Sequence, residues 1–225
     1  TVTNSVGLNP GVGGGVEASV TIHDTVWSNN FTAIYDAPLR IEGVSGDENT
    51  DVSITDTEVY GNTSDDGFCG IEIRYKDQVT LSNVQVHNNL CDGSVVSVRA
   101  QVVSVNQLDA FDNTASSILS FNGEVAVTVE DVTAYGNESE DAVVGVEGPD
   151  ADVSYIDVYD NTGGMGLGLG ARGALGSIVL HHASVVNNEG IAGLFVANDE
   201  GGFNLDLSNI TVANNNTGYP ATFFM

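Results

Sequence analysis

The sequence of 225 residues predicts an all-β solenoid, in which short strands stack in parallel around a shared apolar core. One observation is that eight eleven-residue segments, such as residues 52–62, share one pattern of apolar and polar positions and end on Asn. A second is that nine asparagines recur at steps of 24 to 32 residues: Asn4, Asn30, Asn62, Asn89, Asn113, Asn137, Asn161, Asn188 and Asn215. A period in the twenties with variable spacers is typical of a solenoid.

The first half of the repeat segment predicts a short strand. Positions 1 and 3 are apolar and position 2 is mostly small and polar, as in Val52, Ser53 and Ile54. Alternation with a period of two is typical of a strand with one buried face. Polar residues follow at positions 4 and 5, such as Thr55 and Asp56, and predict a bend.

The second half of the segment predicts another strand, because positions 6 and 8 are apolar and position 7 is polar, as in Val84, Gln85 and Val86. A turn rich in glycine and acidic residues follows the Asn. A third alternating run comes next, for example at residues 71–73. Each repeat is therefore predicted to contain three short strands and three bends, and no long stretch shows helical periodicity.

Stacked copies of such a coil bury a core that one coil cannot bury alone. Equivalent strands would lie in parallel about 4.8 Å apart, and parallel crossovers are overwhelmingly right-handed. We therefore expect a right-handed parallel β-helix of about eight to nine coils, forming a single domain over residues 1–225. Each repeat Asn is expected to adopt the left-handed conformation at a sharp bend. The side-chain amides are expected to form an inward ladder from coil to coil: Asn30, Asn62, Asn89, Asn113, Asn137, Asn161, Asn188 and Asn215.

The repeat resembles the right-handed parallel β-helices of the pectin-lyase-like superfamily over essentially the whole chain. Within it, an Asn repeat combined with a Gly-Gly-hydrophobic stretch is similar to bacterial surface passengers such as chlamydial polymorphic outer membrane proteins. Only some repeats carry the glycine pair. The matching stretches are residues 13–16 before Asn30, residues 163–165 after Asn161 and residues 189–191 after Asn188.

Both ends of the sequence look like parts of coils. Residues 1–4 match the end of a repeat segment, and residues 219–225 match a third strand. The sequence shows no capping helix, no signal peptide and no apolar run of membrane length. We expect a segment of a longer solenoid or a unit whose ends stack on neighbouring copies.

Acidic residues outnumber basic ones by 31 to 5, which gives a formal charge of −26. Such a surface repels nucleic acids and anionic lipids, so we expect no nucleic-acid partner and no membrane insertion. Solubility in a salty medium would explain the acidity without a ligand. Binding of Ca²⁺ is the alternative, because hard cations prefer carboxylate oxygens. No other cofactor is indicated. The candidate ligands lie in turns: Asp65, Asp66, Glu138, Glu140 and Asp141.

The two cysteines, Cys69 and Cys91, are 22 residues apart, close to one coil, and each follows a repeat Asn. They could lie side by side within the Cα separation that a disulfide requires. Two buried free thiols are the alternative. A bridge would indicate an oxidising, exported setting, and the expected location is secreted or at the cell surface.

Enzymes of the superfamily provide a second functional hypothesis. Its lyases use Arg or Lys as a base, and Arg74 and Arg99 fall at equivalent places, with Glu42 in the same column and Glu72 beside it. Outward charges paired along a sheet are the alternative interpretation. The run at residues 65–69 resembles the Asp-Asp-Cys segment of polygalacturonases, but the expected Gly-His-Gly and Arg-Ile-Lys elements do not follow. We therefore assign no catalytic residue.

Position 9 is aromatic in five consecutive repeat segments, and alternation places it outside. A column of rings could bind sugar rings or a protein partner. The alternative is that neighbouring rings simply pack on one another. The residues are Tyr60, His87, Phe111, Tyr135 and Tyr159.

Together these features favour a non-enzymatic, secreted or cell-surface β-solenoid that acts as an adhesive stalk or a filament unit. Its expected partners are neighbouring copies, end to end, or a cell-surface carbohydrate. A polysaccharide lyase or a glycoside hydrolase of the pectin-lyase-like fold is the alternative. Ice binding through the Thr and Ser residues of position 2 is a third hypothesis, although Val179 and Asp206 interrupt that column.

Overall fold

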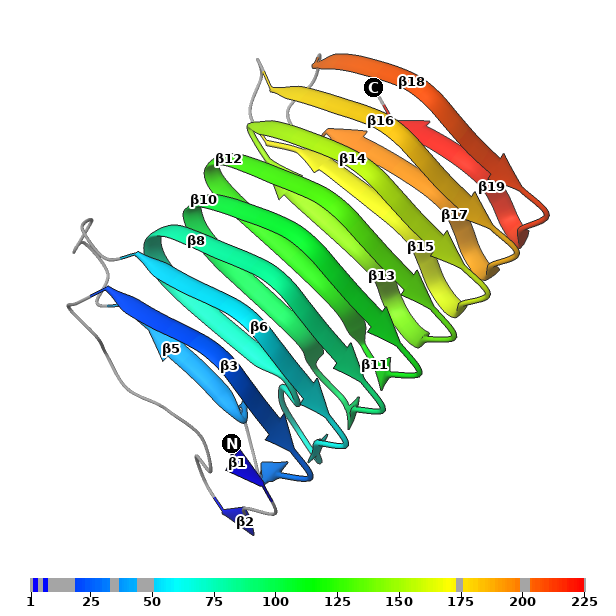
Figure 1. The fold of residues 1–225 in the computed structure, drawn as a ribbon. Coiled ribbons are helices and arrows are strands. Elements are labelled where there is room, and N and C mark those ends of the chain that lie inside the picture. The colour runs from blue at the N-terminus through cyan, green and yellow to red at the C-terminus, as the bar shows by residue number, and fades with distance from the viewer. Residues whose placement is uncertain are drawn as a thin grey trace.

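The computed structural model describes residues 2–3, 6–7, 19–32, 37–43, 51–172, 176–198 and 203–224. These residues form a parallel β-solenoid with strands and no helix, as predicted (Figure 1). Over this part of the chain, no helix is therefore long and apolar enough to cross a membrane. Neighbouring coils pair through parallel strands along the whole stack.

Each coil has three sides. The first side holds positions 1–4 of the repeat segment, the second side holds positions 6–9, and the third side holds the strand that returns after the Asn. The first and second sides form one bent strand rather than two separate strands. These bent strands are β3 (Val20–Ser28), β6 (Val52–Tyr60), β8 (Ile71–His87), β10 (Ser94–Phe111), β12 (Ser117–Tyr135), β14 (Asp150–Tyr159), β16 (Ser177–Val186) and β18 (Asn204–Ala213).

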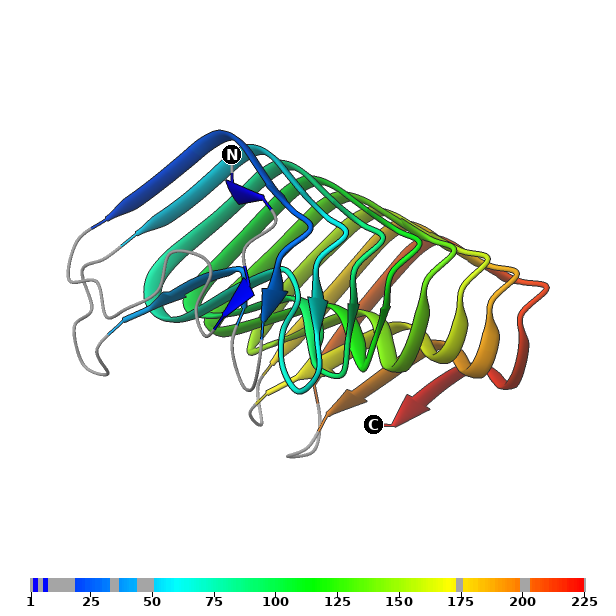
Figure 2. The same ribbon diagram turned by 90° about the horizontal axis from the view of Figure 1, so that it is seen from below.

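Strands β8, β10 and β12 also contain the third side of the preceding coil, which explains their greater length. Figure 2 shows each coil as a bent strand that turns a corner into a return strand. Elsewhere the return strands are separate elements: β5 (Leu39–Glu42), β13 (Glu138–Gly148), β15 (Thr162–Ala171), β17 (Glu189–Asn198) and β19 (Asn216–Phe224). Two-residue strands complete the stack: β1 (Val2–Thr3), β2 (Val6–Gly7), β4 (Phe31–Thr32), β7 (Thr63–Ser64), β9 (Leu90–Cys91) and β11 (Thr114–Ala115).

The solenoid has about six turns, whereas the sequence predicted eight to nine. The prediction counted every repeat segment as a coil. In the first coil, however, residues 33–36 and 44–50 lie outside the described part of the chain. In the last coil, β18 pairs with β16 on one side, and Leu207 there keeps 37% of its surface exposed.

The bends differ from the prediction in one respect. The left-handed residue at the sharp corner is position 10, immediately before the ladder Asn, and not the ladder Asn itself. In the coil of β10, for example, Asp112 has φ of 53° and Asn113 is not among the residues with positive φ. The change of direction therefore occurs one residue earlier, which leaves the Asn backbone free to continue the pairing. A second left-handed residue, position 5, bends the strand between the first and second sides, as at Asp131 with φ of 56°.

The Asn ladder is confirmed over the described repeats. The Oδ1 atom of Asn89 accepts bonds from both the backbone N–H and the Nδ2 group of Asn62, each at 3.0 Å. The second Nδ2 hydrogen of Asn62 bonds the carbonyl of Trp27 at 3.1 Å. The same pattern recurs in each coil to Asn215. Asn4 lies outside the described residues.

One apolar cluster runs through the coils. Within a single coil, Val79, Leu81, Val84 and Val86 fill the four inward positions of the bent strand with at most 1% of their surface exposed. Burial of apolar area stabilises the fold by about 25 cal/mol per Å². Position 9 and the alternate residues of the third side are among the positions that point outward.

Candidate functional site

The five position-9 rings form a stack on the second side, which we call the aromatic column. Successive ring centroids lie 5.1, 4.6, 5.2 and 5.2 Å apart, and the ring planes differ by only 2 to 7°. This spacing follows from the pairing of the strands, because equivalent residues of adjacent coils are direct neighbours. In order, the rings are Tyr60, His87, Phe111, Tyr135 and Tyr159.

Each inner ring of the aromatic column has both faces covered by its neighbours. His87 also bonds through Nε2 to Glu58 at 2.9 Å and through Nδ1 to the amide of Asn88 at 2.8 Å. At the three inner rings, ring edges rather than ring faces are therefore left for a ligand. A sugar that stacks on an aromatic ring needs a free face, so the geometry favours the packing interpretation of this column.

Burial and the local charge around the column both raise the pKa of one ring. Burial raises the pKa of Tyr159, and the nearby Tyr135, Asp157, Asp160 and Asp109 raise it further. Each of these groups disfavours a phenolate beside it. Tyr159 is therefore held in its neutral form.

The third side carries all the basic residues of this acidic chain. Arg40 lies on β5, Arg74 and Lys76 on β8, Arg99 on β10, and Arg172 directly follows β15. Lys76 is buried, and loss of hydration lowers its pKa. The first and second sides therefore carry no Lys or Arg.

Carboxylates compensate the arginines of the third side. Arg40 bonds Glu42 at 2.8 Å. Arg74 pairs with the buried Glu72. Arg99 lies 3.4 Å from Glu124. These arginines are therefore compensated by carboxylates, and the return strands carry further acidic residues such as Glu138 and Glu189.

The column predicted for Arg74, Arg99 and Glu42 is confirmed, because Glu42 pairs in register with Arg74 and Arg74 with Arg99. Arg74 also lies over the ring of Phe68, at 5.5 Å from its centroid. Arg99 similarly lies over the Tyr75 ring at 5.9 Å. Both guanidinium groups are thus held by carboxylates and rings, which matches the interpretation of paired outward charges.

A shallow hollow of about 210 Å³ opens on the third side across β12, β13, β15 and β17. Three glycines contribute no side chain at its floor: Gly145, Gly168 and Gly170. The residues opposite them on neighbouring strands do carry side chains, since Ser120 pairs with Gly145 and Gly168 with Phe195. We call this the glycine hollow, and its other lining residues include Asn122, Ala142, Glu147 and Met165.

The carboxylate of Glu147, which lines the glycine hollow, belongs to a hydrogen-bonded ion pair. Arg172 binds Glu147 through two bonds of 2.6 and 2.8 Å. Asn122 donates from Nδ2 to the same carboxylate at 3.0 Å. A Cβ at Gly170 would lie 3.1 Å from the Glu147 side chain, so glycine makes room for that carboxylate. The Oδ1 atom of Asn122 is buried and has no hydrogen-bond partner.

The predicted metal ligands lie in two separate places. Asp65 and Asp66 follow β7, whereas Glu138, Glu140 and Asp141 lie on β13. Within the described ranges, no three His, Cys, Asp or Glu residues gather in a group that could hold a metal ion. Binding of Ca²⁺ therefore stays a prediction.

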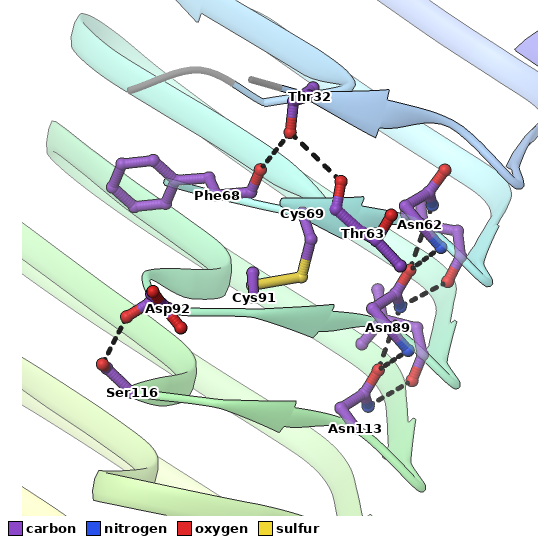
Figure 3. The surroundings of a disulfide bond; sticks show 12 residues. Thr32, Asn62, Thr63, Phe68, Cys69, Asn89, Cys91, Asp92, Asn113 and Ser116 are labelled. Carbon is purple, nitrogen blue, oxygen red and sulfur yellow. Dashed lines mark hydrogen bonds between the residues drawn. A yellow bond between two sulfur atoms is a disulfide. The ribbon is translucent and has the colours of Figure 1, made fainter. Parts of the chain in front are cut away.

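The disulfide between Cys69 and Cys91 is confirmed, with a Cα separation of 5.6 Å. Cys91 lies on β9 and Cys69 in the turn one coil earlier, so the bond links two adjacent coils (Figure 3). Both cysteines are buried. Thr32 fixes the turn beside Cys69 by donating a 3.1 Å bond to the carbonyl of Phe68. The bond is consistent with an extracellular location.

Comparison with known proteins gave no match to a family model, a curated protein or a solved structure. The glycine hollow was not predicted from the sequence. The sequence feature that indicates it is the run Gly166, Gly168 and Gly170, in which glycine occupies alternate positions of a strand. The hollow also depends on the strand register, which places Phe195 beside Gly168.

Proposed function

We propose that this chain is a non-enzymatic, exported β-solenoid that serves as a rigid stalk or adhesive unit at the cell surface. The observation that supports it best is the Asn ladder. Seven consecutive steps, from Asn30 to Asn215, join neighbouring coils by buried side-chain amide bonds along the axis. Each bond resists separation of two coils, and the bonds act in series along the rod.

Two further features hold neighbouring coils together. The aromatic column adds stacked contacts between five coils. The disulfide adds a covalent link between two coils. A structure reinforced once per coil suits a protein that carries load or holds a surface at a distance, and export would allow the disulfide to persist.

The family to which this solenoid belongs is also a proposal. The combination of an inward Asn ladder with a Gly-Gly pair at Gly163 and Gly164 supports membership of the pectin-lyase-like superfamily, close in style to bacterial surface passengers. Contacts with other copies or with a cell-surface carbohydrate would follow from that role.

Pulling single molecules along the solenoid axis tests the stalk. We expect coils to detach one by one at high force, because each step must break a ladder rung. The variant Asn113→Ala should yield first at its own coil, whereas the surface variant Asn106→Ala should behave as wild type. Extension at low force without discrete steps would contradict the proposal.

A separate assay addresses catalysis. Purified protein is incubated with pectate, alginate and neutral polysaccharides, with and without Ca²⁺, and the absorbance of unsaturated products is followed. We expect no increase. Release of an unsaturated product that is lost in the Arg74→Ala or Arg99→Ala variant would overturn the non-enzymatic proposal in favour of a lyase.

A further inference from the structure

We propose that Asn209 is an acceptor for an N-linked oligosaccharide, and that the fold prevents the other acceptor sequences of the chain from carrying one. The acceptor sequence is Asn-x-Ser/Thr, where x is any residue except proline. It begins at five residues: Asn30, Asn62, Asn137, Asn209 and Asn215. This modification rests on the export that the proposed function includes, because such glycans belong to secreted chains. It does not require the role of a stalk.

Four of the five sequences begin at a ladder Asn, and the ladder uses their amides. Asn62 donates both Nδ2 hydrogens to buried acceptors, at 3.0 and 3.1 Å. Asn137 does the same, at 2.9 and 3.0 Å. Asn30 donates to the next rung at 2.9 Å, and Asn215 donates to the carbonyl of Val185 at 2.9 Å. A sugar on Nδ2 replaces one hydrogen and would begin inside the corner of the coil, so a glycan at these positions conflicts with the ladder.

The hydroxyl residues of these four sequences also point inward. Side chains two places apart along a strand share one face, so the residue two places after a ladder Asn follows it toward the interior. Thr32, Ser64 and Ser139 keep at most 6% of their surface exposed. The Oγ1 atom of Thr217 is also buried. Both residues that define the acceptor sequence therefore lie inside the solenoid at these four places.

Asn209 has the opposite orientation. It occupies position 5 of its repeat segment, the left-handed bend between the first and second sides, with φ of 57°. Thr211, the hydroxyl residue of the sequence, occupies position 7, and both side chains are exposed. Nδ2 of Asn209 lies 3.1 Å from Nε2 of the exposed His182. One Nδ2 hydrogen is enough for this contact, so the other can be replaced by a sugar.

The exposure of Asn209 belongs to its position in the repeat and not to its place in the last coil. The described residues at position 5 are all left-handed, with φ from 49 to 57°, and all are exposed. Those from Asp56 to His182 lie on bent strands that pair with a coil on each side. A glycan at this bend therefore projects from the solenoid even where coils continue in both directions. The residues are Asp24, Asp56, Asn83, Gln107, Asp131, Tyr155, His182 and Asn209.

The transfer joins Nδ2 of Asn209 to C1 of the first sugar. The donor is an oligosaccharide linked to a lipid diphosphate. The bond between C1 and the phosphate oxygen breaks, and its electron pair leaves with the lipid diphosphate. A base of the transferase takes the proton that Nδ2 loses. A transferase can reach all five sequences in an unfolded chain, so the fold decides which of these bulky groups a folded molecule tolerates.

The test adds a cleavable signal sequence to the whole chain and produces it in a eukaryotic secretory host. The added signal imposes export, so the result does not depend on whether the native chain is exported, and the pulling experiment on the stalk stays separate. Folded protein is selected from the medium and from the cells by its resistance to protease. A glycosidase that converts each glycosylated Asn to Asp, followed by peptide mass spectrometry, locates the glycans.

Three variants accompany the wild type. Asn209→Gln removes the acceptor amide, and Thr211→Val removes the hydroxyl and leaves Asn209 in place. Gln85→Thr is the matched gain of function, because it completes an acceptor sequence at Asn83, which occupies the same bend in an inner coil.

We expect folded wild-type protein to carry a glycan at Asn209 and none at the ladder asparagines. Asn209→Gln and Thr211→Val should each lose it and keep a cooperative thermal transition, whereas Gln85→Thr should gain a second glycan at Asn83. Folded protein without a glycan at Asn209, or with one at Asn62, Asn137 or Asn215, would overturn the proposal. Retention of the glycan in Thr211→Val would do the same, and an unmodified Asn83 in folded Gln85→Thr would show that the bend does not present an acceptor.

Discussion

The second and third sides of the solenoid use the same stacking of coils in opposite ways. On the second side, outward rings of adjacent coils lie about 5 Å apart and cover one another. On the third side, outward glycines of β13 and β15 leave a hollow beside Phe195. The coil spacing of a parallel sheet is fixed. The size of the outward side chains therefore decides whether residues of adjacent coils contact one another or leave a hollow between them. We therefore expect stability to depend more on the outward column of the second side and on the Asn ladder than on the outward residues of the third side.

The largest effect on stability is expected from a substitution in the Asn ladder. Replacement of Asn113 by Ala removes the acceptor of two bonds from Asn89, one from its backbone N–H and one from its Nδ2 group. Both donors are buried, so we expect a loss of about 2 to 5 kcal/mol in the free energy of unfolding. Denaturant titration with circular dichroism measures it. Asn106→Ala, which removes a long 3.3 Å surface contact to Glu130, is the control and should change stability by less than about 0.5 kcal/mol. Equal effects of the two variants would show that the ladder has no special role.

The disulfide gives the next largest effect. It closes a loop of 22 residues between Cys69 and Cys91. Loss of the bond should lower the free energy of unfolding by about 2 to 3 kcal/mol, because the unfolded chain gains conformational freedom. The measurement compares thermal unfolding with and without a reductant. The double variant Cys69→Ala/Cys91→Ala is the control and should not respond to the reductant. A wild-type melting temperature that is insensitive to full reduction would contradict this expectation.

A matched pair of substitutions sharpens the contrast between the two sides. Phe111→Ala removes a ring that stacks on His87 at 4.6 Å and on Tyr135 at 5.2 Å, and should cost about 1 to 3 kcal/mol. Gly168→Ala adds a methyl group where there is space, and should leave stability unchanged or raise it by up to about 1 kcal/mol. Chemical denaturation of both variants measures the difference. If both substitutions destabilised the protein equally, the third side would be packed as closely as the second.

Much of the fold could be predicted from the sequence, because one residue type marks each coil. The repeat of Asn, with apolar residues at fixed distances before it, was sufficient to predict parallel stacking, the ladder, the aromatic column and the Cys69–Cys91 bond. The bend was placed one residue late, since Asn and its neighbour Asp112 both tolerate the left-handed conformation and only the backbone distinguishes them.

The glycine hollow could not be predicted in the same way. Its existence depends on the absence of side chains at Gly145 and Gly168 and on the register that brings Phe195 beside them. Spacers of different length separate the third side from the repeat segment, so sequence distance does not give that register. Two ion pairs of the third side were hidden for the same reason. Arg99 and Arg172 pair with Glu124 and Glu147 of neighbouring coils. Arg40 and Arg74, by contrast, pair with carboxylates two residues away on the same strand.

The smallest expected effect concerns alkaline pH and the last ring of the aromatic column. Burial, followed by the charges of Tyr135, Asp157, Asp160 and Asp109, raises the pKa of Tyr159 above its ordinary value of 10.0. The folded state therefore favours the neutral phenol. The resulting stability is fully present below the ordinary pKa and is lost as pH rises through the raised pKa.

Denaturation midpoints measured from about pH 8 to pH 11 should consequently fall less steeply in Tyr159→Phe than in the wild type, because phenylalanine keeps the stacked ring and cannot ionise. Tyr219→Phe, which changes an exposed tyrosine of the last coil, is the control for general alkaline effects. A wild-type curve that runs parallel to that of Tyr159→Phe would mean that the acidic neighbours do not act on this ring. The second side would then be stabilised by ring contact alone, and the charge of the surrounding surface would have no part in the difference between the two sides.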